Sequence, residues 1–278
     1  MNRWQDFRYG ARRLRKAPGF TLTAVVTMAL GIGATTATFS ICDAILWKPL
    51  PLPRLDQLVM VQQRVPGDPY DWVRVTPADA QDIRRESASF QGMAFWEGGS
   101  ANIVGAGGEP ERIRGYQVSA NFFDVLGVQP ARGRAFQTGE DQPGRQHQAA
   151  LSDGLWRRRF GADPEILGKP IRLDNENYTV VGIMPERSEF PVRAELWTPL
   201  ALDPEEIHSR TKRRLEAIGR LKPGLTVAQA AEIDAIGARL ARQYPDTNKN
   251  RRFAAALVIY IPARGAMHID PIVALRYE

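Results

Sequence analysis

The stretch IRLDNENYTVVGI, Ile171–Ile183, alternates apolar and polar residues on both sides of a polar turn at 174–177. Alternation with a period of two is typical of strands with one buried face. Two such runs joined by a short polar turn predict a β-hairpin, and therefore an antiparallel pair within a sheet.

Upstream of this hairpin, short strands and helices continue to alternate. Gln148–Leu151 reads as a strand, and Ser152 then caps a helix on which Trp156 and Phe160 share one face. Earlier segments repeat this pattern: strands at 58–63, 92–97 and 111–118, a helix capped by Thr76 that runs to about Ser89, and a short helix capped by Ser119 and passing through Phe122 and Leu126.

Downstream of the hairpin, Leu215–Leu221 predicts a further strand. Thr226 and Gln229 form a capping box for a helix that runs to about Tyr244 and places Ile233, Ile236 and Leu240 on one face. Strands and helices are about equally numerous, and no βαβ regularity indicates a parallel sheet. The expected fold class is therefore α+β.

The N-terminal part of the chain contains 26 consecutive residues without a formal charge, Ala17–Cys42. At about 1.5 Å per residue this run is long enough to cross a hydrocarbon layer of about 30 Å. A cleaved signal peptide is the alternative, but its apolar region is usually about 7–15 residues long. We predict an uncleaved transmembrane helix at 19–47.

Charge on the two sides of this run sets the predicted orientation. Residues 1–16 hold six Lys/Arg and one acid, whereas the sixteen residues after Cys42 hold two Lys/Arg. The N-terminus is therefore expected in the cytoplasm and everything after residue 47 outside, in a single-pass protein of the cell inner membrane. Segment 1–18 is expected to be a basic amphipathic stretch on the inner surface, and the interfacial anchors are expected to be Arg12, Arg13, Lys16 and Trp47.

Small residues form a stripe on the predicted membrane helix. Ala29, Gly33 and Ala37 recur every four residues, a spacing that lets another helix approach closely. The stripe is expected either to contact a partner helix or to face lipid.

The sequence lacks the common signatures of catalysis and of cofactor binding. It contains no G-x-x-x-x-G-K-[ST], G-x-S-x-G or H-E-x-x-H motif, one cysteine (Cys42) and three widely separated histidines. We therefore expect no enzyme activity and no metal or cofactor site. Residues 1–16 carry +5 of the net charge of +6, which indicates a membrane rather than nucleic acid as the partner of the basic residues.

Several motifs resemble one protein family. FRYGARRLRKAPGFT (Phe7–Thr21) and ALGIGATTATFS (Ala29–Ser40) are similar to the N-terminus of MacB/FtsX-type ABC transporter permeases, especially the duplicated permeases. The segments that resemble the MacB-like periplasmic core domain are VSANFFDVLGVQP (Val118–Pro130), LSDGLWRRRFG (Leu151–Gly161) and LKPGL (Leu221–Leu225).

The resemblance implies an export or efflux component whose periplasmic domain transmits motion or contacts substrate or a partner. That domain, 48–247, is expected to have a porter-like lobe (50–90 and 200–247) with an inserted second lobe (91–199). ATP would be bound only by a partner ABC ATPase subunit. A second copy or a paired permease, and a periplasmic adaptor, are the other partners that the resemblance implies.

The C-terminal part departs from the family pattern. Phe253–Ala263 provides about eleven apolar residues, too few for a span, and 248–278 resembles a remnant of the permease C-terminus without most of its membrane helices. The alternative function is therefore an anchored extracytoplasmic interaction module, or a truncated remnant, without transport activity. No residue identifies the substrate.

Overall fold

The computed structural model describes residues 18–42, 52–64, 72–105, 108–188, 190–228 and 232–258. The chain divides into two compact units: one contains helix α2, and the larger runs from Leu50 to Ile261. The helices are α2 (Pro18–Cys42), α3 (Pro77–Glu86), α4 (Phe122–Leu126), α5 (Asp153–Phe160), α6 (Pro204–Ile207), α7 (Glu232–Gln243) and α8 (Pro245–Asn248), with 3-10 turns at Leu55–Gln57 and Pro164–Ile166.

Helix α2 occupies most of the predicted segment 19–47, and all of its 25 residues are uncharged. Its threonine hydroxyls bond back along the helix, as when Thr27 Oγ1 donates to the carbonyl of Thr23 at 2.8 Å. Large apolar side chains such as Leu22 and Leu30 are about two-thirds exposed, at 67% and 69%. Within the described ranges no helix combines the length and the apolar character that a membrane crossing requires. The transmembrane assignment therefore stays a prediction.

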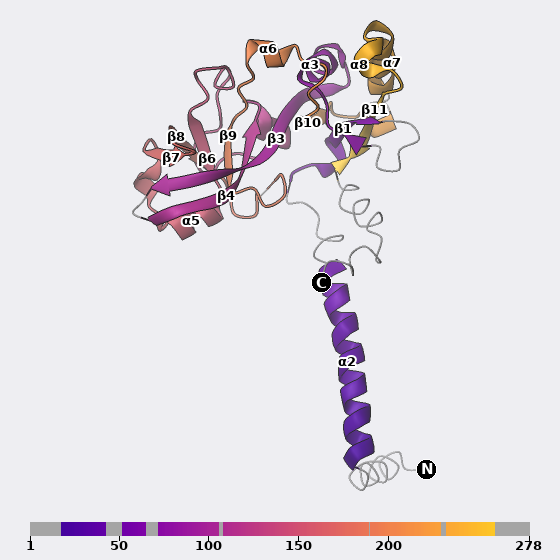
Figure 1. Ribbon diagram of the computed structural model, residues 1–278, viewed down its shortest axis with the longest axis vertical. Coiled ribbons are helices and arrows are strands. Elements are labelled where there is room, and N and C mark those ends of the chain that lie inside the picture. Colours follow the sequence, from indigo (N-terminus) through magenta and orange to yellow (C-terminus); the bar gives the residue numbers. More distant parts are fainter. Residues whose placement is uncertain are drawn as a thin grey trace. The chain divides into compact units, whose positions relative to one another are not determined.

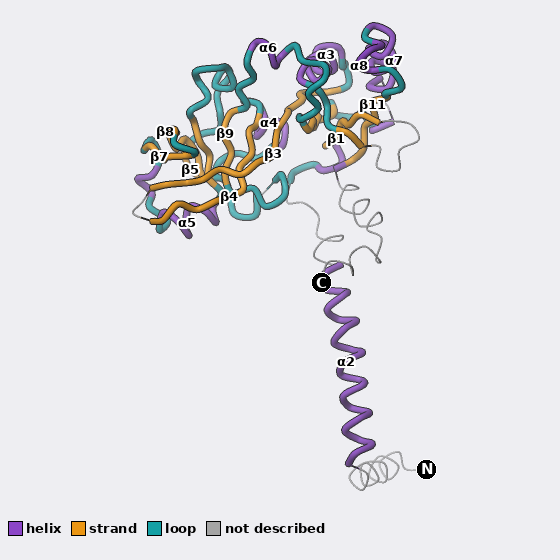
Figure 2. Tube along the Cα trace, in the orientation of Figure 1, coloured by secondary structure: helices purple, strands orange, loops and turns teal. Residues whose placement is uncertain are grey.

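The larger unit is built on one mixed sheet of eleven strands. Nine of them form the path β11-β1-β10-β3-β4-β9-β6-β8-β5, while β2 pairs with β1, and β7 pairs with β3 and β8. Most neighbours are antiparallel, while β4 with β9 and β6 with β8 are parallel. This confirms a mixed α/β fold (Figures 1 and 2). The strands are β1 (Leu58–Arg64), β2 (Trp72–Val73), β3 (Phe90–Gly105), β4 (Gly108–Val118), β5 (Arg132–Gly133), β6 (Gln148–Leu151), β7 (Pro170–Leu173), β8 (Glu176–Ile183), β9 (Leu196–Pro199), β10 (Glu216–Leu221) and β11 (Arg252–Leu257).

Strand β1 lies in the interior because both of its faces are covered. Val59 and Val61 join a cluster with Ile83 of α3 and Leu240 of α7, which we call the α3–α7 cluster. Leu58 and Met60 point the other way, into a cluster around the phenylalanines of α4. Side chains of a strand alternate between faces, so an apolar run of this kind fits a strand buried on both sides.

The α3–α7 cluster and a third cluster around α5 occupy different parts of the sheet. Phe95 of β3 belongs to the α3–α7 cluster, whereas Ile103, later in the same strand, packs with Leu155 and Trp156 of α5. Strand β3, which the expected bounds assign almost wholly to the inserted lobe, therefore contributes to both clusters. The lobe boundaries stay a prediction, because Leu50–Ile261 forms one compact unit.

The predicted hairpin is present as β7 and β8, with Leu173 opposite Glu176. Its turn is shorter than expected and consists of Asp174 and Asn175, both in the left-handed region with φ of 45° and 74°. Asn and Asp tolerate that region, and two such residues make the turn whose twist suits an antiparallel pair.

Two expected helix starts are confirmed, and one is wrong. The side chains of Thr76 and Ser152 cap α3 and α5 by accepting from the N–H groups of Asp79 and Leu155. Ser119 does not cap α4: its Oγ accepts from the N–H of Phe95 at 3.0 Å, so it holds the connection to β3 instead. The expected partner of Thr226, Gln229, lies outside the described residues.

The expected end of the domain at residue 247 is also corrected. Residues 252–257 form β11, which pairs with β1 over six residues, from Val59 opposite Leu257 to Arg64 opposite Arg252. Phe253 is 1% exposed and packs so tightly on α7 that a Cβ at Gly237 would lie 2.5 Å from its ring. Strand β11 therefore completes the core of the domain, although the sequence assigned its residues to a remnant of the permease C-terminus.

Candidate functional site

A polar groove lies along β3, β4 and β9 and is also lined by the hairpin β7–β8 and by the segment before β10. Its volume is about 330 Å³. Strand register places Glu97 opposite Gln117, and Gln117 beside Thr198, so that three polar side chains form one row. None of the residues that line the groove is a histidine or a cysteine.

Two glycines face each other on adjacent strands at the floor of the groove, so no side chain projects into it there. Gly99 of β3 lies directly opposite Gly115 of β4, two residues along from the polar row. A Cβ at Gly99 would meet no atom within 4 Å, whereas one at Gly115 would make ordinary contacts with Ala101 and Leu196. Glycine pairs inside strands often mark the close approach of another group. Here Gly99 leaves the backbone of β3 open to solvent, whereas Gly115 is buried.

One wall of the groove is formed by Arg214 and the two glutamates that pair with it. Arg214 Nη2 donates to Glu206 at 3.0 Å, and its Nε lies 3.3 Å from Glu97 Oε2, an ion pair without hydrogen-bond alignment. Burial raises the pKa of Glu97, an effect that the charges of Arg214 and Arg74 oppose and that of Glu206 reinforces. The Glu97 carboxylate is therefore poorly solvated and suited to accept a hydrogen bond from a ligand.

The opposite wall comes from the hairpin β7–β8. Burial, together with the charges of Glu176 and Asp174, raises the pKa of the Tyr178 hydroxyl, which stays protonated and able to donate at neutral pH. Glu176 also lies 3.2 Å from Nε2 of His147. No three His, Cys, Asp or Glu side chains in the described part of the chain gather closely enough to hold a metal ion.

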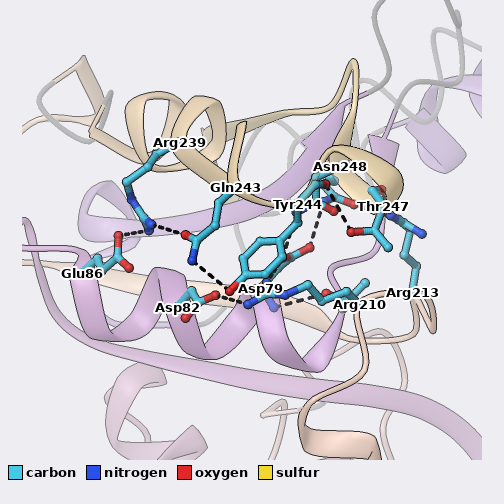
Figure 3. A network of polar contacts seen from close by, with 12 residues as sticks. Asp79, Asp82, Glu86, Arg210, Arg213, Arg239, Gln243, Tyr244, Thr247 and Asn248 are labelled. Atoms are coloured by element: carbon cyan, nitrogen blue, oxygen red, sulfur yellow. Dashed lines mark hydrogen bonds and ion pairs between the residues drawn. The ribbon is translucent and has the colours of Figure 1, made fainter. Parts of the chain in front are cut away.

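A buried polar network adjoins the groove through the segment that carries Arg214. Figure 3 shows Asp79 and Asp82 of α3 facing Arg210, with the ring of Tyr244 stacked against its guanidinium. Arg210 donates to Asp79 at 2.6 Å and to Asp82 at 2.7 Å, and its carbon Cζ lies 3.6 Å from the Tyr244 ring centroid. Burial alone would lower the pKa of Arg210, but the hydrogen bond and charge of Asp82, with the charge of Asp79, raise it.

Asp79 is fully buried, and its carboxylate accepts further hydrogen bonds. Its carboxylate also accepts from Nε2 of Gln63 at 3.2 Å and from Nδ2 of Asn248 at 3.0 Å. Arg213 extends the network by donating to Gln63 at 3.0 Å and to the carbonyl of Thr247 at 2.7 Å. Helix α3, the segment before β10 and helix α8 are thereby joined by charge-assisted hydrogen bonds, which are stronger than neutral ones.

The site residues expected from the sequence lie elsewhere. Ala29, Gly33 and Ala37 are exposed along α2, and a Cβ at Gly33 would meet no atom within 4 Å. The expected interfacial anchors Arg12, Arg13, Lys16 and Trp47 lie outside the described residues. Sequence reasoning missed the groove and the network. The glycines inside β3 and β4 were the available signal for the groove.

Comparison with known proteins places this fold in a family. Residues 21–236 of the 278 match the family described as the MacB-like periplasmic core domain. A curated relative, the macrolide export ATP-binding/permease protein MacB of Burkholderia thailandensis, is 43% identical over 67 residues, which is 24% of this chain. That match spans only 10% of the length of the relative.

Two solved structures share the fold. The periplasmic region of MacB from Actinobacillus actinomycetemcomitans superposes with a TM-score of 0.55 at 15% identity, covering 84% of this chain and 99% of that one. The extracellular domain of the noncanonic ABC-type transporter YknZ from Gram-positive bacteria gives 0.50 at 15% identity, covering 70% and 98%. The chain therefore belongs to the MacB/FtsX-type permease family, with the MacB-like periplasmic core domain.

Proposed function

We propose that this chain is a membrane-anchored, non-enzymatic component of an ABC-type export or efflux system. The observation that carries the proposal is the family match over residues 21–236, which includes most of α2 and nearly all of the sheet. The domain built on that sheet would lie outside the cell inner membrane. ATP would be hydrolysed by a partner nucleotide-binding subunit, since this sequence carries no phosphate-binding loop.

The anchor that we propose is the segment 19–47. It is supported by the 25 uncharged residues of α2, by their exposed apolar side chains and by the cluster of basic residues that precedes them. Anionic headgroups attract such a cluster on the cytoplasmic side. Within this anchor, the open stripe of Ala29, Gly33 and Ala37 would pack against a helix of a second copy or of a paired permease.

The outer domain is proposed to act as a stiff element that contacts a substrate or a periplasmic adaptor. The network around Asp79 ties α3 to the segment before β10 and to α8, so a displacement of one of them moves the others. The groove beside it presents three carboxylates, two phenols and an amide, without a histidine or a cysteine among the residues that line it (Glu97, Asp174, Glu176, Tyr116, Tyr178 and Gln117). These groups favour binding over chemistry.

The alternative function is an anchored interaction module that does not transport. Affinity purification of the tagged full chain after mild solubilisation separates the two. An exporter component is expected to bring an ABC ATPase with it, with ATP hydrolysis inhibited by vanadate. Recovery of the folded chain with neither an ATPase nor such hydrolysis would overturn the exporter proposal and favour the module.

A further inference from the structure

The β3–β4 hairpin carries a second cavity, which shares Gly99 and Ser100 with the groove. Its volume is about 550 Å³, and three arginines line it with Ser100 and Glu195. The strand register explains the grouping: Ser100 lies opposite Arg114, and Arg112 is two residues from Arg114 on the same face. The third arginine, Arg193, comes from the loop before β9.

Neighbouring groups position these arginines. Arg112 Nε donates to Oγ of Ser100 at 2.9 Å, which leaves its two terminal nitrogens available. Arg114 Nη1 donates to the carbonyl of Val192 at 3.3 Å, and that carbonyl also accepts from the hydroxyl of Tyr116 at 3.1 Å. Arg193 has a φ of 56°, in the left-handed region. The guanidinium groups of Arg112 and Arg114 are thus held near the cavity by bonds that use only part of their donors.

The acids near this cavity are already engaged. Glu195 accepts from Nη2 of Arg158 at 2.8 Å through one oxygen and from the backbone N–H of Arg114 at 3.1 Å through the other. Glu111 is paired with Arg158 at 2.7 Å. Among the residues with described side chains, no carboxylate forms an ion pair with any of the three arginines that line the cavity. The cavity therefore concentrates positive charge, which an anion would relieve.

We propose that this cavity binds a phosphate group. Guanidinium groups match phosphate oxygens with two parallel N–H donors, and several arginines converging on one cavity suit a doubly charged oxyanion. The group could come from a free phosphate or from a lipid headgroup. Val192, a large apolar side chain that is 68% exposed, adjoins Arg193 and offers a contact for an acyl chain. This proposal goes beyond the proposed function and does not depend on transport.

The test uses the purified full chain in a non-ionic, phosphate-free detergent, titrated in a calorimeter. Inorganic phosphate probes the free anion, and short-chain phosphatidic acid probes the lipid source. We expect saturable binding of at least one of them, weakening as salt rises. The double variant Arg112→Gln/Arg193→Gln should bind about tenfold or more weakly, since it removes two charge-assisted contacts.

The matched control is Arg157→Gln/Arg242→Gln, which removes the same charge from exposed positions away from the cavity. It should bind like the unmodified chain, and all variants should keep the same unfolding temperature. If only phosphatidic acid binds, the site recognises a lipid. If both probes bind, the site recognises the phosphate group that they share. The proposal is overturned by the absence of saturable binding, by equal binding in the cavity variant, or by tighter binding of an acidic peptide than of either probe.

Discussion

The Nη1 of Arg210 lies 2.6 Å from Oδ1 of Asp79, although 131 residues of sequence separate them. The Asp79 side chain is completely buried, and that of Arg210 is 17% exposed. A carboxylate so far from water is stable only when it is paired and hydrogen-bonded. This contact therefore holds the segment before β10 against α3 and supports the stiffness that the proposed function requires.

Replacing Arg210 should destabilise the domain strongly. Arg210→Met leaves the Asp79 charge buried and partly unpaired, so the free energy of unfolding should fall by about 3–5 kcal/mol. Urea unfolding of the full chain in detergent measures it. The comparison variant is Arg74→Met, which breaks the ion pair between Arg74 and Glu216. Because the Arg74 side chain is 54% exposed, this variant should lower the free energy of unfolding by about 1 kcal/mol or less. Equal losses in the two variants would contradict the role given to Arg210.

Removing the Phe253 side chain tests whether β11 completes the core. Phe253→Ala should lower the free energy of unfolding by about 3–5 kcal/mol, because a fully buried ring is deleted from the α3–α7 cluster. Phe253→Leu keeps most of the volume and should lose less than half as much. If Phe253→Ala left the unfolding transition unchanged, residues 252–257 would not be part of the folded core.

The two glycines Gly99 and Gly219 should respond oppositely to alanine. Gly99→Ala meets no atom and should be neutral or stabilise by about 0.4–1 kcal/mol through the unfolded state. At Gly219 a Cβ would lie 2.2 Å from the ring of the buried Phe90, so Gly219→Ala should cost about 1–3 kcal/mol. Thermal unfolding of both variants checks the pair. A destabilised Gly99→Ala would mean that the groove floor is covered.

Acid should weaken the contact between Arg134 and Glu140. Burial pushes the pKa of Glu140 upward, but hydrogen bonds from Arg134 and from the N–H of Gln137, with the Arg134 charge, bring it below its usual 4.5. The ionised form is thus favoured in the folded state, so its stabilisation is complete above pH 4.5 and is lost as pH falls through the lowered value.

The measurement is the difference in unfolding free energy between the unmodified chain and Glu140→Gln, from pH 7 to pH 3. The difference should be constant above about pH 5 and shrink below pH 4.5. Arg134→Gln should remove the same dependence, because it removes the guanidinium that lowers the pKa. A difference that grows as the pH falls would mean that the pKa of Glu140 is raised.

Local signals predicted the elements of this fold better than its long-range contacts. The polar turn at Asp174 and the cap at Ser152 act on neighbouring backbone, so the sequence alone indicated them. Ser119 carries the same capping signal, but its hydroxyl bonds a strand 24 residues away. Residues 252–257 were predicted to lie outside the domain because 248–278 resembles the C-terminal part of the family, and a short apolar run does not reveal which strand it pairs with.

The candidate site was harder to predict than the fold. The basic run around Arg213 is typical of a solvated loop. Only the folded structure shows that Arg213 donates to Gln63 and to the carbonyl of Thr247, which are distant in sequence. The groove depends on Gly99 and Gly115 being register partners, and sequence patterns do not give the register of distant strands. Helix α2 was predicted as a helix because its signal is local.

The sheet domain is proposed to lie outside the membrane, with the N-terminus inside the cell. Labelling of single cysteines in intact cells by a small membrane-impermeant maleimide tests it most directly, in a Cys42→Ser background. Glu205→Cys, at an exposed position in α6, should be labelled without lysis, whereas Asn2→Cys should be labelled only after lysis. Labelling of Glu205→Cys only after lysis would place the sheet domain inside the cell and rule out the proposed orientation.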